Sequence, residues 1–186
     1  MIASAQDLAV RTRADWESLP AGRWEVVDGR AILLPPPTYK HQRLSDRLVA
    51  ELNRQLESQR LGYAASAVGV FVPPLNHSLG EVQSRIPDIV VSSKQPEAHF
   101  EEGSPPELVI EILSTRRGSV ERTEKLDDYA RAGVGEYWIV NPIDRIVETH
   151  VLKDGDYVLE ADTQVLRPKA FPGTEIDMRG IWPVLD

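Results

Sequence analysis

Two carboxylates interrupt apolar, strand-like segments of this chain: Asp88 lies in the segment 86–91 (IPDIVV) and Glu111 in 108–113 (LVIEIL). An ionised carboxylate in apolar surroundings is costly unless it is paired, neutralised or bound to a metal ion. If the two strands are neighbours, about 4.8 Å apart, their acids can share one cation. Hard oxygen ligands suit Mg²⁺, with Mn²⁺ as a substitute. The alternative is two structural acids, satisfied by backbone amides or an arginine.

Four other polar residues are candidates for the same site, and each also has an ordinary structural interpretation. Glu25, in the first strand of a predicted hairpin, can add a third carboxylate or be a solvated acid. Lys125, on a predicted helix, can hold a scissile phosphate and stabilise charge in the transition state, although most helix lysines are solvated. His41 begins the buried stripe of another helix, where it is a core residue or a site residue. Ser114 ends the Glu111 strand and either caps the following loop or orders the site.

The charge of the chain restricts how it could bind nucleic acid. A formal net charge of −8 counts against binding through a broadly basic surface. A nucleic-acid substrate therefore requires a local basic patch, a metal ion, or both. Arginine forks suit phosphates, although arginines in a loop are equally often solvated. The candidates for such a patch are Arg85, Arg116, Arg117 and Arg122.

The pattern of apolar residues predicts one α/β domain over residues 1–186: a mixed sheet flanked by helices, with a core at about 20–160, an N-terminal helical segment at 1–19 and a C-terminal extension at 161–186. Leucines four residues apart mark the buried face of one helix, and Asp-Gly pairs between strand-like runs mark two hairpins. The predicted elements are a helix within 4–18, a hairpin at 24–34, a helix at 39–58 capped by Thr38, a strand at 63–72, a loop at 73–84, strands at 86–91 and 108–113, a helix at 120–132, a strand at 136–140, a hairpin at 145–160 and a short strand near 164–167.

Composition excludes several classes of protein. There is no cysteine, which excludes a disulfide framework and a thiolate metal site. No run of 18 apolar residues is present, so no membrane span is expected. The first residues lack the basic and apolar regions of a secretory signal, and we expect a cytoplasmic location.

Several motifs in a fixed order resemble one known family, the Uma-type restriction endonuclease domain of the PD-(D/E)XK nuclease fold. The resemblance covers about residues 20–160, and the ordered set is more specific than any single piece. The motifs are Trp24-Glu25-Val26-Val27-Asp28-Gly29, Pro37-x-x-x-His41-Gln42, Pro87-Asp88, Glu111-Ile112-Leu113-Ser114 and Glu124-Lys125-Leu126-x-x-Tyr129-x-x-x-Gly133-Val134-x-Glu136-Tyr137-Trp138.

The resemblance implies a restriction-endonuclease-like core and Mg²⁺-dependent hydrolysis of phosphodiester bonds in DNA, often by a homodimer. Asp88 and Glu111 match the two metal-binding acids, and Glu25 becomes a third site residue. The broader fold carries its lysine two residues after the glutamate, where this chain has Leu113, so Lys125 is expected to replace it. His41 and Ser114 would order the ligands. Asn141 stands where relatives usually carry aspartate, a position we expect to be structural.

Two other functions remain compatible with the sequence. The domain could be a nuclease fold that has lost catalysis and serves as a binding or oligomerisation module. The net charge and the displaced lysine favour this interpretation, whereas the presence of both Asp88 and Glu111 opposes it. Alternatively, it could be a metal-dependent hydrolase of small phosphate esters, which would prefer nucleotides to plasmid DNA.

Overall fold

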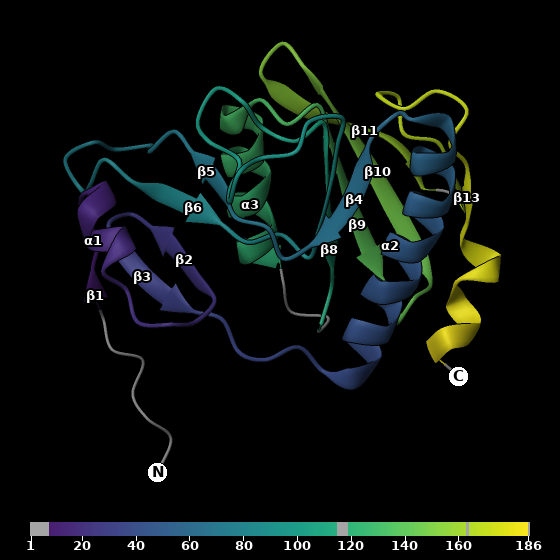
Figure 1. Cartoon of the computed structure of the whole chain (residues 1–186), viewed down its shortest axis with the longest axis horizontal. Helices are drawn as coiled ribbons and strands as arrows, with labels where there is room; N and C mark the ends of the chain where they lie inside the picture. Colours follow the sequence, from purple (N-terminus) through teal and green to yellow (C-terminus); the bar gives the residue numbers. More distant parts are fainter. Residues whose placement is uncertain (1–7, 115–118, 163, 186) are drawn as a thin grey trace.

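A six-stranded mixed sheet forms the centre of the molecule in a computed structural model, which describes residues 8–114, 119–162 and 164–185 (Figure 1). Its strands are β4 Tyr63–Ser66, β7 Ile89–Ser92, β8 Leu108–Ile112, β9 Glu136–Asn141, β10 Ile146–Lys153 and β11 Asp156–Asp162. They are arranged in the order β11-β10-β9-β8-β7-β4, with β8 and β9 parallel and the other neighbours antiparallel. This confirms the mixed α/β architecture expected from the sequence.

A five-stranded antiparallel sheet lies at the end of the molecule away from the C-terminus (Figure 1). Its strands are β1 Leu8–Ala9, β2 Trp24–Val27, β3 Arg30–Leu33, β5 Val70–Val72 and β6 Gln83–Arg85. Their order is β1-β3-β2-β6-β5, and the short helix α1, Arg13–Glu17, accompanies them. Thr12 caps α1 through a reciprocal hydrogen-bond pair with Asp15, which fixes the start of this helix.

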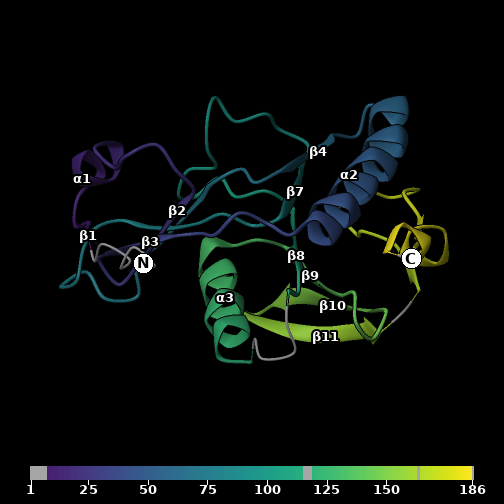
Figure 2. The same cartoon turned by 90° about the horizontal axis from the view of Figure 1, so that it is seen from below.

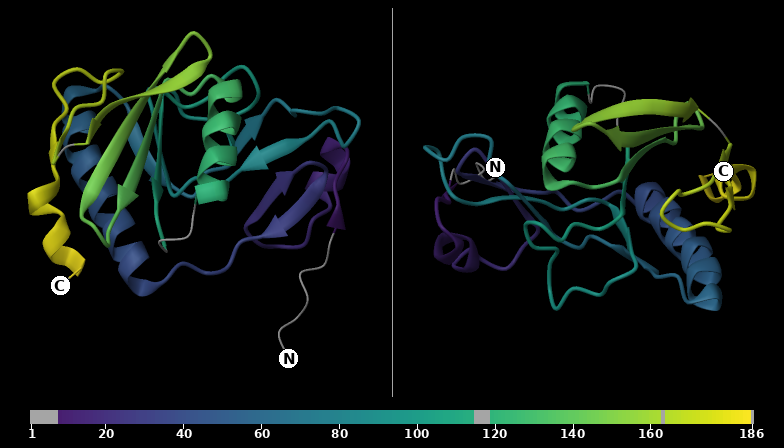
Figure 3. Two further views of the ribbon diagram at one scale, coloured as in Figure 1. Left: turned by 180° about the vertical axis from the view of Figure 1, so that it is seen from behind. Right: turned by 90° about the horizontal axis from the view of Figure 1, so that it is seen from above.

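Two longer helices cover opposite faces of the six-stranded sheet, as seen from below and above (Figures 2 and 3). These are α2, Tyr39–Gln59, and α3, Ser119–Ala132. The predicted cap Thr38 accepts a hydrogen bond from the His41 amide and begins α2. Among the described residues, no helix is long and apolar enough to cross a membrane.

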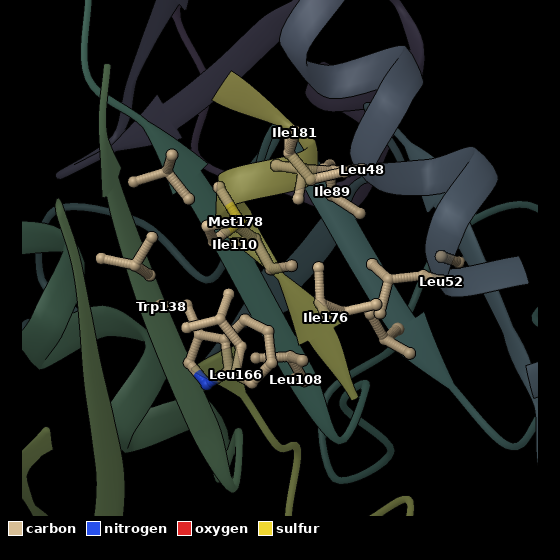
Figure 4. Close-up of a cluster of buried hydrophobic side chains, with 14 of the residues drawn as sticks. Leu48, Leu52, Ile89, Leu108, Ile110, Trp138, Leu166, Ile176, Met178 and Ile181 are labelled. Carbon is tan, nitrogen blue, oxygen red and sulfur yellow. The ribbon is translucent and has the colours of Figure 1, made fainter. Parts of the chain in front are cut away.

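Each helix builds a separate core against the sheet. On the α2 face, the predicted leucine stripe packs on β7, β8 and β9, together with the C-terminal segment that lies beside α2 (Figure 4). That segment comprises β12 Val165–Leu166, β13 Ile176–Asp177 and the short 3₁₀ helices Met178–Gly180 and Trp182–Leu185. On the α3 face, Tyr129 and Ala132 pack against Val109, Tyr137 and Val70. The polar residues of the candidate site lie beside this second core.

One bent two-stranded ribbon connects the two sheets. In the six-stranded sheet β4 pairs with β7, and in the five-stranded sheet β5 pairs with β6. The chain bends between them at Ala67, whose backbone lies in the left-handed region with φ 55°, and at the opposing residues 86–88. The Ala67 amide donates to the Asp88 carbonyl oxygen at 3.1 Å, so Asp88 stands at the bend.

Four elements differ from their sequence-based predictions, and one is the strand predicted at 86–91, which begins only at Ile89 as β7. The segment 63–72 is not one strand, because the left-handed backbone at Ala67 divides it into β4 and β5. The helix expected within 4–18 covers Arg13–Glu17 alone, since Leu8–Ala9 pairs with β3; residues 1–7 lie outside the described part. The predicted loop 73–84 already contains the start of β6. Both hairpins are confirmed, with positive φ angles at Asp28-Gly29 and Asp154-Gly155.

These two Asp-Gly turns give a matched test of packing. A Cβ on Gly29 (φ 74°) would lie 2.1 Å from the Leu79 carbonyl oxygen, whereas a Cβ on Gly155 (φ 94°) would meet nothing within 4 Å. We expect Gly155→Ala to lower the free energy of unfolding by about 1 kcal/mol through backbone strain alone. Gly29→Ala should cost about 3 kcal/mol, because the steric clash adds to the strain. Equal midpoints for the two variants in urea unfolding would contradict the close approach.

Candidate active site

The antiparallel register of β7 and β8 brings the two predicted acids together. Ile89 pairs with Ile110, so Asp88 and Glu111 are the next residues in the same register. Side chains directly opposite one another in an antiparallel pair share a face of the sheet, with Cβ atoms about 5 Å apart. In agreement, the charge on Asp88 contributes to the pKa of Glu111. The structure therefore places both acids on the α3 face, at the ends of neighbouring strands.

Asp88 is held by one of its two carboxylate oxygens. Oδ2 accepts a hydrogen bond from the Ile112 amide at 2.7 Å and lies 3.1 Å from His41 Nε2. The hydrogen bond with Asp88 raises the pKa of His41, while burial opposes this rise. Neither contact uses Oδ1. His41 is thus in the site, as one of its two interpretations expected, and it orients Asp88 from the first turn of α2.

Glu111 is buried, and two donors from α3 reach the same one of its oxygens. Lys125 Nζ donates to Oε1 at 3.0 Å, and the Tyr129 hydroxyl donates to Oε1 at 2.9 Å. The pKa of Glu111 is raised to about 7, and burial is the largest cause. The charges of Asp88 and Glu25 also raise this pKa, while the charge of Lys125 opposes the rise. Burial also raises the pKa of Tyr129 well above its usual value, which keeps this hydroxyl protonated as a donor. Neither of these hydrogen bonds uses the second carboxylate oxygen, Oε2.

A buried row of alternating charges continues from Glu111 into the five-stranded sheet. Lys125 Nζ lies 3.7 Å from Glu25 Oε1, and Glu25 Oε2 accepts from Arg85 Nη1 at 3.1 Å. Arg85 Nε in turn donates to Asp128 Oδ2 at 2.5 Å. Burial disfavours the charge on Arg85, but the carboxylates of Asp128 and Glu25 outweigh it and raise its pKa. Glu25 is therefore beside Lys125, and its two oxygens are engaged by protein groups.

The prediction that Arg85 contacts DNA is wrong. Its side chain is 4% exposed and is held between Glu25 and Asp128, so no phosphate can reach it. The reason is that Arg85 points to the α3 face of β6, where two buried acids require a cation.

The other residues predicted for the site either make no described contact with the two acids or lie in parts of the chain that the structure does not describe. Ser114 is exposed and lines, with His41, a cavity of about 440 Å³; in the described part of the chain it makes no hydrogen bond to either acid. Arg116 and Arg117 lie outside the described residues, and the side chain of Arg122 is not described either. Leu113, which occupies the position where the broader fold carries its lysine, packs beside the α3 core.

Two contributors to the site were missed by sequence reasoning, Tyr129 and Asp128. The sequence motifs include Tyr129 without a role for it, and they do not include Asp128. Helical spacing could have indicated both, because residues three and four positions after Lys125 lie on the same helix face. The spacing could not predict that Tyr129 contacts Glu111 and that Asp128 contacts Arg85, since Glu111 and Arg85 belong to different sheets.

The donor set of the site suits a small divalent cation. Four buried or half-buried carboxylates, Glu25, Asp88, Glu111 and Asp128, face the cations Arg85, Lys125 and Arg131, so negative charge exceeds positive unless His41 is protonated. Among the described residues, no three histidine or acidic side chains are arranged around one point as ligands. Mg²⁺ commonly takes one or two carboxylates and completes its shell with water and substrate phosphate. Asp88 and Glu111 therefore fit Mg²⁺, and none of the hydrogen bonds described above uses Asp88 Oδ1 or Glu111 Oε2.

Comparison with known proteins places the chain in a family. No curated protein matches it. A crystal structure described as a "putative nuclease belonging to DUF820 from Anabaena variabilis ATCC 29413" superposes with a TM-score of 0.71 at 20% identity, covering 93% of this chain and 98% of that one. At this identity the likeness shows the fold. The model of the Uma2 family, described as "Putative restriction endonuclease", matches residues 13–179. The chain therefore belongs to the Uma2 family, as the resemblance of its motifs indicates.

Proposed function

We propose that this protein is a Mg²⁺-dependent endonuclease that hydrolyses phosphodiester bonds in DNA at the Asp88–Glu111–Lys125 site. One observation carries the proposal: the ammonium of Lys125 lies 3.0 Å from Glu111, although it comes from α3 and not from the position two residues after the glutamate. The net charge and the displaced lysine are the arguments for a fold that has lost catalysis. The position of Lys125 beside Glu111 weakens the second of them.

Each residue then has a defined part in the reaction. Asp88 and Glu111 would hold Mg²⁺, and the bound cation supplies Lewis acidity that polarises a phosphate oxygen and eases deprotonation of water. Lys125 offsets the negative charge that develops on the phosphate in the transition state. Glu25, 3.7 Å from Lys125, helps to hold the ammonium in place. His41 holds Asp88 in the orientation required of a ligand.

Binding of a polyanion by this acidic protein needs further positive charge. We propose that Arg116, Arg117 and Arg122, which follow the Glu111 strand in the chain, supply phosphate contacts. Arg85 is no longer a candidate, because it is buried. We also propose a homodimer, in which each copy would act on one strand of the duplex.

The direct test incubates the protein with supercoiled plasmid and Mg²⁺ or Mn²⁺, beside Asp88→Asn, which preserves the volume of the side chain. Metal-dependent nicking by the wild type, lost in Asp88→Asn and on chelation, would support the proposal. Equal nicking by both proteins would overturn it. Hydrolysis of nucleotides without any nicking of plasmid or oligonucleotides would instead indicate a phosphate-ester hydrolase.

A conservative change at Tyr129 tests how the site is ordered. Tyr129→Phe removes the hydroxyl that donates to Glu111 Oε1 and leaves the ring in the core. Loss of a group that orients a metal ligand typically weakens metal affinity or activity about 10- to 100-fold. We expect this loss in Mn²⁺ affinity by titration calorimetry. The control is Tyr63→Phe, whose hydroxyl donates to the Lys94 carbonyl, remote from the acids in the hydrogen-bond network. Unchanged Mn²⁺ affinity in Tyr129→Phe would contradict the assignment.

A further inference from the structure

An aromatic cavity lies on the opposite face of the five-stranded sheet from Glu25 and Arg85. Its volume is about 450 Å³, and its walls include Trp16, Trp24, Phe71 and His99. The face follows from strand alternation, because Trp24 and Ser84 neighbour Glu25 and Arg85 along β2 and β6 and so point the other way. The cavity is thus separate from the proposed catalytic site, although the two share strands.

The floor and one wall of the cavity are defined by register and ring packing. Ser84 pairs with Phe71 on one side and with Val26 on the other, so these three side chains share one sheet face. The Trp16 ring packs on Phe71 and His99, with centroid distances of 5.0 and 4.9 Å. Ser84 therefore places a single hydroxyl on a floor that is otherwise apolar and aromatic.

Unsatisfied polar atoms concentrate around this cavity. Five buried side-chain polar atoms in the described part of the chain lack a hydrogen-bond partner, and three of them belong to residues that line it: Trp16 Nε1, Arg23 Nε and Ser84 Oγ. Ser84 is itself only 3% exposed. Buried donors without partners are rare in folded proteins, because each costs free energy. Three around one cavity indicate a ligand that supplies acceptors.

We propose that this cavity binds a nucleobase that carries ring carbonyl groups. Two N–H donors and a hydroxyl can meet carbonyl oxygens, and the surrounding rings can stack on a planar heterocycle. In the present arrangement the three polar atoms are covered, so binding requires side chains of the lining to move, and those of Trp16 and Arg23 are only half-buried. The rings and donors together specify a planar, acceptor-rich ligand, whereas an aliphatic ligand would leave all three donors unsatisfied.

Size and charge agree with this ligand. A cavity of about 450 Å³ is in the range of small-molecule sites and accommodates a nucleoside. One guanidinium group stands at it, because Arg23 lines the cavity. It favours a phosphate on the same ligand. The choice of a nucleobase among planar acceptors rests on the proposed function, since a nuclease encounters unpaired bases and nucleotide products.

The cavity also adjoins the proposed catalytic strands. Ala67 and Ile86, at the bend of the ribbon that carries Asp88, both line it. The Ile86 amide donates to Glu25 Oε1 at 3.1 Å on the other side of the strand. A base held in this cavity would therefore lie against the segment that leads directly into Asp88.

Titration calorimetry with thymidine monophosphate, in the presence of a chelator, tests the proposal without catalysis. The matched variants are Trp16→Phe, which removes one N–H and keeps a ring, and Ser84→Ala, which removes a buried hydroxyl that has no partner. Each lost hydrogen bond should weaken the affinity about five- to tenfold. Thermal stability should be unchanged or higher in Ser84→Ala, so a loss of binding there does not reflect unfolding.

Further arms identify the source of the base and separate this proposal from the nuclease proposal. Tighter binding of single-stranded oligothymidylate than of the free nucleotide would assign the cavity to an unpaired base in DNA, and the reverse order would assign it to a free nucleotide; either supports base recognition. Equal binding of abasic deoxyribose 5-phosphate would overturn the proposal, as would affinities that neither variant changes. No detectable binding at nucleotide concentrations of about 10 mM would also overturn it. Asp88→Asn should bind thymidine monophosphate normally, so failure of the nuclease test leaves this result interpretable.

Discussion

Replacing Glu111 with glutamine should reduce metal-dependent plasmid nicking about 1000-fold or more, because a single change removes an anionic metal ligand and the negative charge that pairs with Lys125. The substitution preserves the volume of a buried side chain, so the fold should survive. Nicking rates and Mn²⁺ titrations measure the effect. Glu107→Gln is the matched control, since Glu107 directly precedes the same strand, β8. Its carboxylate accepts a hydrogen bond from the Ser93 amide and contacts none of the site residues described above.

In the absence of metal, Glu111→Gln should be more stable to unfolding than the wild type, because of the raised pKa of Glu111. The folded-state pKa of Glu111 is raised from 4.5 to about 7, so its ionisation is unfavourable in the folded protein. Wild-type stability is therefore lost progressively as the pH rises from about 4.5 through 7, whereas glutamine does not titrate. The advantage of Glu111→Gln in urea unfolding should grow over this interval and then level off. A wild type that is more stable than the variant at pH 8 without metal, together with undiminished nicking by the variant, would contradict the assigned role.

Replacing Arg85 with alanine should lower the free energy of unfolding by about 3 kcal/mol, since it removes the cation that two buried carboxylates share and leaves only Lys125 beside Glu25 and Arg131 beside Asp128. Glu25 and Asp128 have side chains only 4% and 5% exposed, so solvent cannot replace the guanidinium. Urea unfolding at pH 7 measures the loss.

An exposed arginine gives the control for this experiment. Arg54 pairs with Glu51 on the surface of α2 and its side chain is 67% exposed, so Arg54→Ala should change stability by no more than about 0.5 kcal/mol. Neutralising both acids in Arg85→Met/Glu25→Gln/Asp128→Asn should recover most of the loss, because it removes the uncompensated charges. Similar losses in Arg85→Ala and Arg54→Ala would show that the buried row contributes little.

The parts of the fold that could be predicted are those encoded by short-range patterns. The leucine stripe of α2 and the Asp-Gly turns depend on spacing within a few residues, and both are present in the structure. The pairing of Asp88 with Glu111 was predictable for a similar reason, because apolar strands interrupted by one acid suggest a shared need for a cation. The inference about the two acids was conditional on their strands being neighbours, and the register of β7 and β8 meets this condition.

What could not be predicted depends on contacts between distant segments. Nothing near Ala67 in the sequence signals a left-handed backbone, so one predicted strand became two in different sheets. Arg85 resembled a surface cation because neither Glu25 nor Asp128 is its sequence neighbour. The side-chain partners of Lys125 likewise emerge only when α3 is packed across both sheets.

The bent ribbon has a consequence for how far this protein could be shortened. Glu25 and Arg85 belong to the five-stranded sheet, whereas Glu111 belongs to the six-stranded one, and Asp88 stands where the chain passes between them. Cutting the molecule into its two sheets would sever both strands of the ribbon and leave each fragment with part of the acid–lysine assembly. Neither fragment would contain all the residues of the proposed site, so that site depends on the small N-terminal sheet as well as on the larger one.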